Sequence, residues 1–155
     1  MPEKEEILNF WFKECKPEQW FKKKEDFDQM IENRFSDAIE DAIAGKLDNW
    51  EDTETGCLAL ILLLDQFTRN VFRDTPRAFA GDKRALVLSQ LCCDKDFLAN
   101  PDIHRRQFML MPMMHSENLA VQDAALHLFK KYASEKDYEY AEKHREIIAR
   151  FGRFP

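Results

Sequence analysis

Glycine is scarce in this chain, and so are valine and threonine. Only 4 of the 155 residues are glycine, which leaves little material for the tight turns that β-hairpins need. Valine and threonine are β-branched residues that suit a pleated sheet, whereas the apolar positions here are weighted toward leucine and alanine, which favour helix. The composition therefore predicts an all-α fold and argues against a sheet.

Long hydrophobic runs are also missing. The longest unbroken apolar run, Cys57–Leu64, falls far short of the roughly 20 residues that a helix needs to cross a bilayer. The segment Pro2–Glu6 is mostly charged and lacks the basic-then-apolar pattern of a secretory signal. We therefore expect a cytoplasmic protein with no membrane partner.

The cysteines and the charge balance exclude further classes. No two of the four cysteines, Cys15, Cys57, Cys92 and Cys93, have the C-x-x-C spacing, so we expect reduced thiols, no metal and no cofactor. The net charge of -6 argues against nucleic acid as a partner. Glycine-rich phosphate loops, the G-x-S-x-G nucleophile motif, HExxH and EF-hand patterns are all absent. Familiar catalytic chemistries therefore have no signature here.

Amphipathic helical patterns, by contrast, follow one another along the whole chain. Apolar residues make up 45% of it and charged residues 34%, as in a globular protein. The length suits one domain, so we predict a single all-helical domain over 1–155. Apolar spacing and cap signals predict an antiparallel array of about seven helices. The expected segments are Glu3 to about Lys13, Phe27–Ile43 after an Asp26 N-cap, Gly56 to about Arg73, Thr75–Leu91, Asn100–Leu110 with Pro112 bending or ending it, Glu117 to about Ala133 after a Ser116 N-cap, and Ser134–Gly152.

The most distinctive polar string lies on the third of these helices. Asp65, Arg69 and Arg73 step by four, and Gln66 and Asn70 do the same, so in an α-helix the five share an arc of about 140°. Two guanidinium groups beside two amides suit a carboxylate or phosphate ligand, because guanidinium donates in pairs. The plainer alternative is an exposed helix end held by Asp65–Arg69 pairing, which contributes only about a few tenths of a kcal/mol.

Two further polar strings follow in the second half of the chain. His115 and Glu117 flank Ser116 at an expected helix start, where they form either an anion, acid–base or metal site or a simple capping sequence. Near the C-terminus, His144 precedes Arg150 and Arg153, which alternate with phenylalanines. This end is either a helix terminus whose arginines complement the dipole, or a basic, aromatic lip that closes over an anion.

These strings also carry a family resemblance. ILNFWF, DQMIENRF, GCLALILLLDQFTRNVFR, PRAFAGD, LMPMMHSE and H-x-x-I-I-x-R-FGRFP occur in order over essentially the whole chain. Together they resemble the bacterial family called domain of unknown function 924. That family is similar in fold to tetratricopeptide-like helical arrays, so the resemblance implies such an architecture. It implies no activity or substrate.

Each motif of the family can be matched to particular residues of this chain. Asp65, Gln66, Arg69 and Asn70 match the DQF-x-RN string, and Asp82 matches the aspartate after the PRAF turn. His115 to Glu117 match HSE, and the string from His144 to Arg153 matches the C-terminal motif. In the family that motif continues with further polar residues, typically His-Arg-Asn, so a site completed by them would be partial in a chain ending at Pro155.

Three functions are open at this point. The first is a binding module that holds an anionic small molecule or an acidic peptide through its arginines. The second is a hydrolase or transferase in which His115 or His144 acts as acid or base, oriented by Asp65 or Glu117. The third is a scaffold whose polar cluster only fixes helix packing. The candidate ligand-binding residues are Asp65, Gln66, Arg69, Asn70, Arg73, Asp82, His115, Glu117, His144, Arg150 and Arg153.

Overall fold

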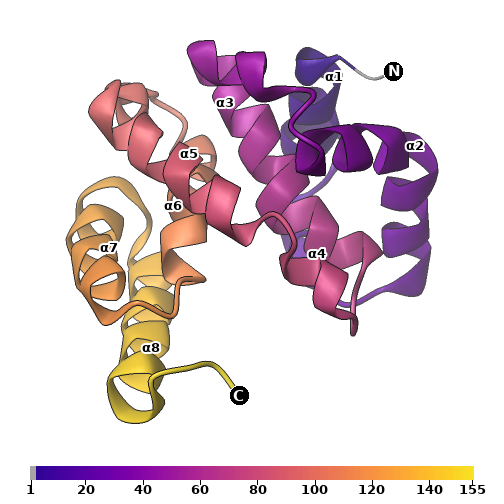
Figure 1. Ribbon diagram of the computed structural model, residues 1–155. Helices are drawn as coiled ribbons and strands as arrows, with labels where there is room; N and C mark the ends of the chain where they lie inside the picture. Colours follow the sequence, from indigo (N-terminus) through magenta and orange to yellow (C-terminus); the bar gives the residue numbers. More distant parts are fainter. Residues whose placement is uncertain (1–2) are drawn as a thin grey trace. The chain divides into compact units, whose positions relative to one another are not determined.

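The computed structural model describes residues 3–155, and helix dominates it (Figure 1). The structure is 78% helical, and residues 3–155 contain no strand. Helix α3 (Glu54–Ile61), the π-helical segment η4 (Leu62–Phe67) and helix α4 (Thr68–Val71) form one continuous run, so the described part of the chain holds seven helices. The predicted all-α class is confirmed. The tetratricopeptide-like arrangement stays a prediction.

The chain divides into two compact units, residues 1–88 and 89–155. The single domain expected from the sequence stays a prediction, and each unit is described by itself. None of the helices in residues 3–155 is long and apolar enough to cross a membrane.

The first unit is built around an aromatic core. Helix α1 (Lys4–Asn9) continues into a π-helical turn, η1 (Phe10–Glu14), and packs against α3, while α2 (Glu25–Ile43) packs against η4 and α4. Short 3-10 turns η2 (Pro17–Gln19), η3 (Asp48–Asp52) and η5 (Pro76–Phe79) connect these helices. Rings from η1, α2 and η4 lie with their centroids 5.0 to 6.5 Å apart, and the shared set is Phe10, Trp11, Phe27, Phe35 and Phe67. Such pairs add to the free energy that burial itself contributes.

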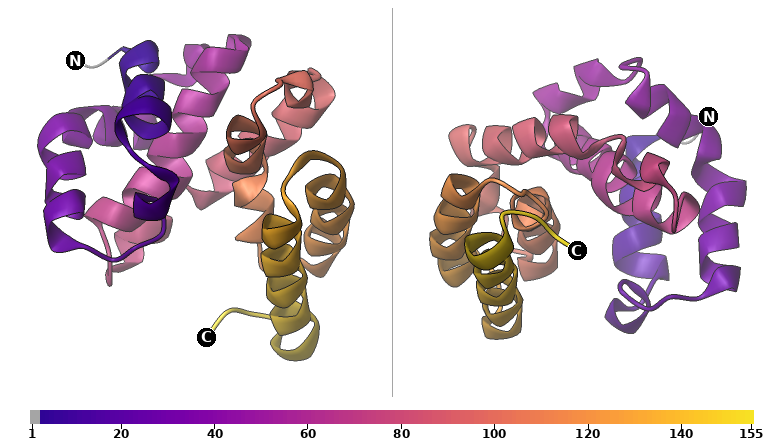
Figure 2. Two further views of the ribbon diagram at one scale, coloured as in Figure 1. Left: turned by 180° about the vertical axis from the view of Figure 1, so that it is seen from behind. Right: turned by 60° about the horizontal axis from the view of Figure 1, so that its bottom comes forward.

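The second unit is a stack of three helices. They are α6 (Ile103–Met114), α7 (Leu119–Tyr132) and α8 (Glu135–Phe151), preceded by the 3-10 turn η6 (Phe97–Ala99). Helix α5 (Asp82–Asp94) crosses the division between the units. Only two residues join α7 to α8, and these helices lie side by side in all views (Figures 1 and 2). At the end of α8, Gly152 has φ +70°, the left-handed conformation in which helices commonly stop.

Two expected caps are each two residues out of place. Helix α2 begins at Glu25 after Lys24, so Asp26 lies inside its first turn. Helix α7 is capped by Asn118, whose side chain accepts hydrogen bonds from two backbone N–H groups, and not by Ser116. Ser116 instead accepts from the Asn118 N–H at 3.1 Å. Ser116 and Asn118 are both good capping residues, so the sequence does not decide between them, and α2 begins without any side-chain cap.

Two expected helices also have different ends. Thr75 and Pro76 start only the 3-10 turn η5, and α5 begins separately at Asp82. Helix α6 continues through Pro112 to Met114, so the proline does not end it. All residues from Gln107 to Met114 are buried, and their packing offsets the cost of about 3 kcal/mol that an interior proline imposes.

Candidate functional site

In the first unit, Arg69 is the centre of the polar string. Its Nη1 donates to the Asp65 backbone carbonyl at 2.7 Å and to the Asp65 carboxylate at 3.3 Å. Its two terminal nitrogens also donate to both oxygens of Asp82, at 2.8 and 3.0 Å. The predicted Asp65–Arg69 pair is therefore confirmed, but only 2% of the Asp65 side chain is exposed, so it is not a surface pair.

The position of Asp82 depends on the preceding glycine. A Cβ added to Gly81 would lie 2.3 Å from the Leu64 carbonyl oxygen and 2.7 Å from the Leu64 Cβ. No larger residue fits at this separation, so Gly81 allows the start of α5 to contact the π-helical segment directly. The next residue, Asp82, then lies within hydrogen-bonding distance of Arg69. The ring of Phe79 also lies 5.4 Å from this guanidinium.

A second network joins the remaining residues of the string to helix α2. Gln66 donates to Asn70 at 3.1 Å, and Asn70 donates to Asp28 at 2.9 Å. Arg73 binds the same carboxylate through Nε at 2.9 Å and Nη2 at 3.2 Å. Asp28 was not among the residues predicted for the site. Its signal was present, because it is the aspartate of the DQMIENRF string, but nothing in the sequence connects it with Asn70 or Arg73.

Both guanidinium groups of the string are held in the charged form. Burial lowers the pKa of Arg69, but the carboxylates of Asp65 and Asp82 outweigh it, and the net pKa is raised. The hydrogen bond that Arg73 donates to Asp28 is the largest cause of the raised pKa of Arg73. Each arginine therefore binds a carboxylate of its own unit through two nitrogens.

In the second unit, a buried glutamine shapes the segment that carries His115. His115 is the C-cap residue of α6. The amide nitrogen of Gln122 on α7 donates to the carbonyls of Met114 and Ser116 at 2.8 and 2.6 Å, and to that of Met113 at 3.5 Å. Met114 is the last residue of α6, so its carbonyl lacks a partner within that helix. Gln122, which is 1% exposed, thus fixes the turn from α6 into the HSE string.

The C-terminal residues dock on this same unit. The backbone N–H of Phe154 donates to Glu117 at 2.7 Å, and the Phe154 ring packs edge-on against His144 with 5.5 Å between centroids. Glu117 and His144 are therefore brought together through the chain end. The sequence suggested that the C-terminal segment could form a basic, aromatic lip. In the structure the backbone N–H of Phe154 holds this segment near the start of α7.

His144 is a neutral imidazole with a defined tautomer. Its Nδ1 lies 2.8 Å from the Tyr140 carbonyl. Because a carbonyl oxygen can only accept, Nδ1 carries the hydrogen, and Nε2 of the neutral ring is left as an acceptor. Burial is the largest cause of the lowered pKa of His144; the Tyr140 hydrogen bond raises this pKa and the charge of His115 lowers it further. His115 and His144 thus lie close enough to affect each other.

The two C-terminal arginines differ from Arg69 and Arg73. Arg150 and Arg153 are exposed, and within residues 3–155 neither forms an ion pair with a carboxylate. The Arg150 guanidinium lies 5.1 Å from the Phe151 ring. By contrast Arg145, on the same helix, binds Asp123 at 2.8 Å. Arg150 and Arg153 are therefore exposed without a carboxylate partner in this part of the chain.

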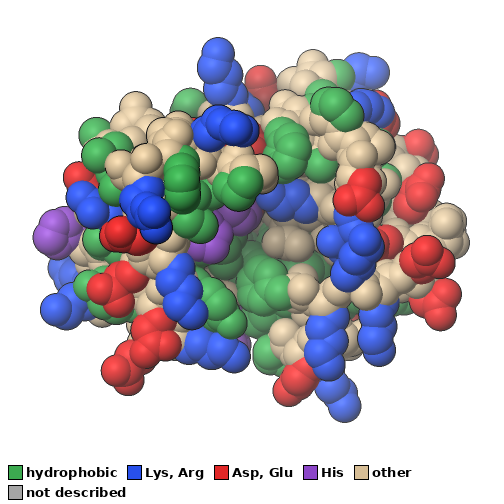
Figure 3. Space-filling view, turned by 90° about the horizontal axis from the view of Figure 1, so that it is seen from below, with side chains coloured by type: hydrophobic (Ala, Val, Ile, Leu, Met, Phe, Trp, Pro, Cys, Tyr) green, Lys and Arg blue, Asp and Glu red, His purple; other side chains and the backbone are tan. Residues whose placement is uncertain are grey.

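Two wider observations concern metals and surface charge. Among residues 3–155 there is no group of three His, Cys, Asp or Glu side chains arranged to hold a metal ion. On the face shown in Figure 3, basic and acidic side chains are interspersed with hydrophobic ones. That face therefore carries charges of both signs. The charge near a bound anion would depend on the few residues around it.

The candidate residues therefore form two groups, one in each unit. The group of the first unit contains Asp65, Gln66, Arg69, Asn70, Arg73 and Asp82, and the structure adds Asp28. The group of the second unit contains His115, Glu117, His144, Arg150 and Arg153. In the first group every arginine is paired within the unit, and in the second group two arginines are not.

Comparisons with known proteins identify the family. A solved structure of a protein of unknown function, ATU0120 from Agrobacterium tumefaciens, is similar with a TM-score of 0.92 and 36% sequence identity, and the match covers 98% of this chain and 85% of that one. The curated proteins gave no match. The family described as "Bacterial protein of unknown function (DUF924)" matches residues 7–155. The chain therefore belongs to this bacterial family, domain of unknown function 924.

Proposed function

We propose that this chain is a binding protein for an anionic small molecule or an acidic peptide, and that Arg150 and Arg153 take the anion. The observation that carries the proposal is their exposure without a carboxylate partner in the described part of the chain. An exposed guanidinium offers paired N–H donors to a carboxylate or phosphate. Two such charges outweigh the partial negative charge, roughly half a unit, at the end of helix α8.

The surroundings of these arginines support the same assignment. Phe154 is fixed at Glu117 and His144, so the segment that carries Arg153 is attached at its far end. Less conformational freedom is then lost when a ligand binds. The His144 ring adds an acceptor nitrogen beside the chain end, which would suit a ligand that has a hydroxyl or amide donor next to its acidic group.

In this proposal the first group of residues supports the first unit and does not take the anion. Arg69 and Arg73 each bind a carboxylate of the same unit through two nitrogens. An external anion would have to displace Asp82 or Asp28 and leave that carboxylate unpaired. Displacement of this kind costs several kcal/mol, about 2 or more, when the group is largely buried.

A thermal-shift series tests the proposal. The wild type, the double variant Arg150→Gln/Arg153→Gln and the control Arg145→Gln are heated with phosphate, citrate and a glutamate-rich peptide. A ligand at about 100 times its Kd contributes about 2.7 kcal/mol, which raises the Tm of a protein of this size by about 5 °C or more. The double variant should lose this shift and the control should keep it.

Two results would contradict the proposal. One is a wild type that shows no shift with any anion of the series. The other is a double variant that shifts as much as the wild type. The control matters because Arg145 lies on the same helix but is paired with Asp123, so its loss removes an equal charge without removing an unpaired donor.

A second candidate function is hydrolysis or group transfer with His144 as the base. The observation that favours it is the neutral ring whose Nδ1–H is held by Tyr140, since this leaves Nε2 ready to accept a proton. Turnover of carboxylic and phosphoric esters would be compared in the wild type, His144→Gln and the exposed control His127→Gln. Loss of about 100-fold in His144→Gln alone is expected, and equal turnover in all three variants would exclude this role.

A further inference from the structure

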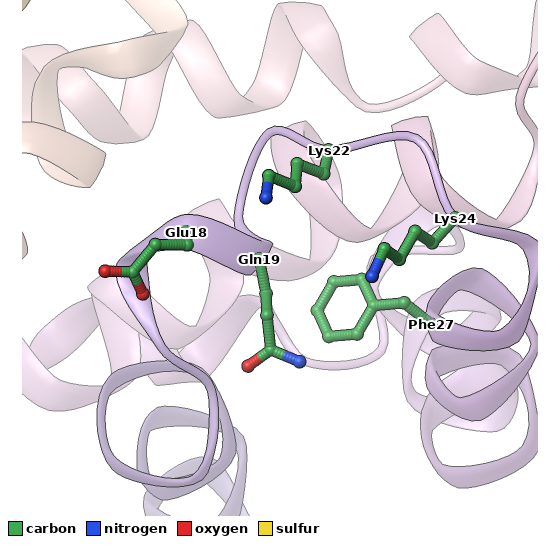
Figure 4. Close-up of a pocket in the computed structure, with 5 residues that line it drawn as sticks. All are labelled: Glu18, Gln19, Lys22, Lys24 and Phe27. Atoms are coloured by element: carbon green, nitrogen blue, oxygen red, sulfur yellow. The ribbon is translucent and has the colours of Figure 1, made fainter.

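A cavity in the first unit is lined by two lysine side chains and an aromatic ring. It has about 310 Å³ of empty space, part of it open to solvent, and is lined by Glu18, Gln19, Lys22, Lys24 and Phe27. Figure 4 shows the Lys24 ammonium beside the Phe27 ring and the Lys22 side chain extending toward Gln19. The Glu18 carboxylate points away from both ammonium groups in this view.

The two ammonium groups lack acidic partners. Within residues 3–155 neither Lys22 nor Lys24 forms an ion pair, whereas the lysine between them, Lys23, binds Asp74 at 3.6 Å. Two like charges that face one small space repel each other, and an anion between them removes that repulsion. The lysine ammonium is also a common binder of phosphate, to which it donates as a point charge.

Phe27 and Gln19 also line the cavity and bear on which ligand would fit it. The ring of Phe27 belongs to the aromatic core and is only 6% exposed, so the apolar wall is rigid. Gln19 is held at the cavity by its bond from the Lys16 N–H at 2.7 Å.

We propose that this cavity binds a small anion carried on a flat apolar ring, with the acidic group between Lys22 and Lys24 and the ring against Phe27. The site is independent of the proposed function, because none of its residues belongs to the group around Arg150 and Arg153.

Calorimetric titration of phenyl phosphate tests this site. The proteins are the wild type, the double variant Lys22→Ala/Lys24→Ala and the matched control Lys23→Ala. The wild type should bind phenyl phosphate at least about tenfold more tightly than inorganic phosphate, because the ring adds its contact with Phe27. The double variant should lose about tenfold or more in affinity, and the control should stay within about twofold of the wild type.

Benzoate and benzylamine separate charge from ring. Benzoate should bind, since it keeps the negative charge, and benzylamine should not. The site is overturned if the wild type shows no saturable binding of phenyl phosphate up to about 10 mM, if the double variant binds as well as the wild type, or if benzylamine binds as tightly as benzoate. The same titrations are made in the Arg150→Gln/Arg153→Gln background, where the anion site of the proposed function is removed, so failure here and failure of the proposed function give different results.

Discussion

The guanidinium of Arg69 binds both oxygens of Asp82, at 2.8 and 3.0 Å, and its Nη1 also reaches the buried carboxylate of Asp65 at 3.3 Å. One side chain thus connects the end of the central helix run with the start of α5. The three groups differ in access to water: 21% of the Arg69 side chain is exposed, 2% of Asp65 and 32% of Asp82. Asp65 is therefore the least hydrated of the three.

Replacement of this arginine should be costly. Arg69→Met removes the cation that pairs with the buried Asp65 carboxylate, so we expect the free energy of unfolding to fall by about 3 kcal/mol. Chemical denaturation at pH 7 would measure this, with an unchanged m-value as the sign that the folded state is otherwise intact.

The double variant Arg69→Met/Asp65→Leu is the matched control for that experiment. It removes the buried charge together with its partner, and Asp82 can be hydrated because it is partly exposed. The double variant should recover most of the stability that the single variant loses. A double variant as unstable as Arg69→Met would show that the cost comes from another contact of the arginine, such as its bond to the Asp65 carbonyl.

The two glycines Gly81 and Gly152 should respond differently to alanine. Gly81→Ala places a Cβ 2.3 Å from a backbone oxygen, which cannot move aside as a side chain can, so we expect a loss of about 3 kcal/mol. Gly152→Ala meets no atom within 4 Å, but its φ of +70° is unfavourable for alanine, and this should cost about 1 kcal/mol. Denaturation of both variants would compare the two effects; equal losses would mean that the Leu64 contact is not limiting.

Acid should destabilise the protein partly through His144. Burial lowers the pKa of this histidine below 6.5 in the folded state, so between the two pKa values the unfolded chain binds more protons. The contribution of His144 to stability is then complete above about pH 6.5 and is lost as the pH falls through the folded pKa. Denaturation midpoints at pH 7.5 and 5.5 should differ more in the wild type than in His144→Gln. The same difference in both proteins would assign the pH dependence to other groups.

The folded protein should resist thiol reagents. Burial, followed by the charge of Glu14, raises the pKa of Cys15 to about 12, although Arg34 lowers it somewhat. Burial also raises the pKa of Cys93. Since the thiolate is the reacting form, both cysteines should react slowly with a disulfide reagent at pH 8 and rapidly after unfolding in denaturant. Fast reaction of native Cys15→Ser would identify one of the other cysteines as accessible.

Helical spacing was enough to predict some contacts of the site but not others. The pairs Asp65–Arg69 and Gln66–Asn70 are four residues apart and do interact, because side chains at that spacing are neighbours on any helix. Asp28 lies 42 positions from Asn70, and no local pattern specifies such a contact. The carboxylates that neutralise Arg69 and Arg73 are thus a product of tertiary packing, which explains why the arginine-rich string looked like an anion site.

The helix caps and turns were also predicted in part: local signals predicted some of them, and other features had no such signal. Ser134 accepts from the Asp137 N–H at 3.1 Å and Gly45 has φ +81° after α2, as their positions in the sequence predicted. The π-helical segment η4 had no sequence signal, since nothing in its sequence LLLDQF distinguishes bonding from i to i+5 from α-helical bonding. The arc of the polar string was derived for a regular α-helix, so it did not anticipate how Asp65 and Arg69 would be arranged across that segment.

The π-helical segment has a consequence for the length of the chain. Bonds from residue i to i+5 accommodate one more residue in a turn than α-helical bonds do. Loss of one residue from Leu62–Leu64 can therefore be absorbed by a return to α-helical bonding, with Thr53 still at the N-cap and Arg69 still facing Asp82. One deletion anywhere else in this helix would rotate all that follows by about 100°. The central helix is thus tolerant of shortening at one place, directly before the residues that hold the first unit together.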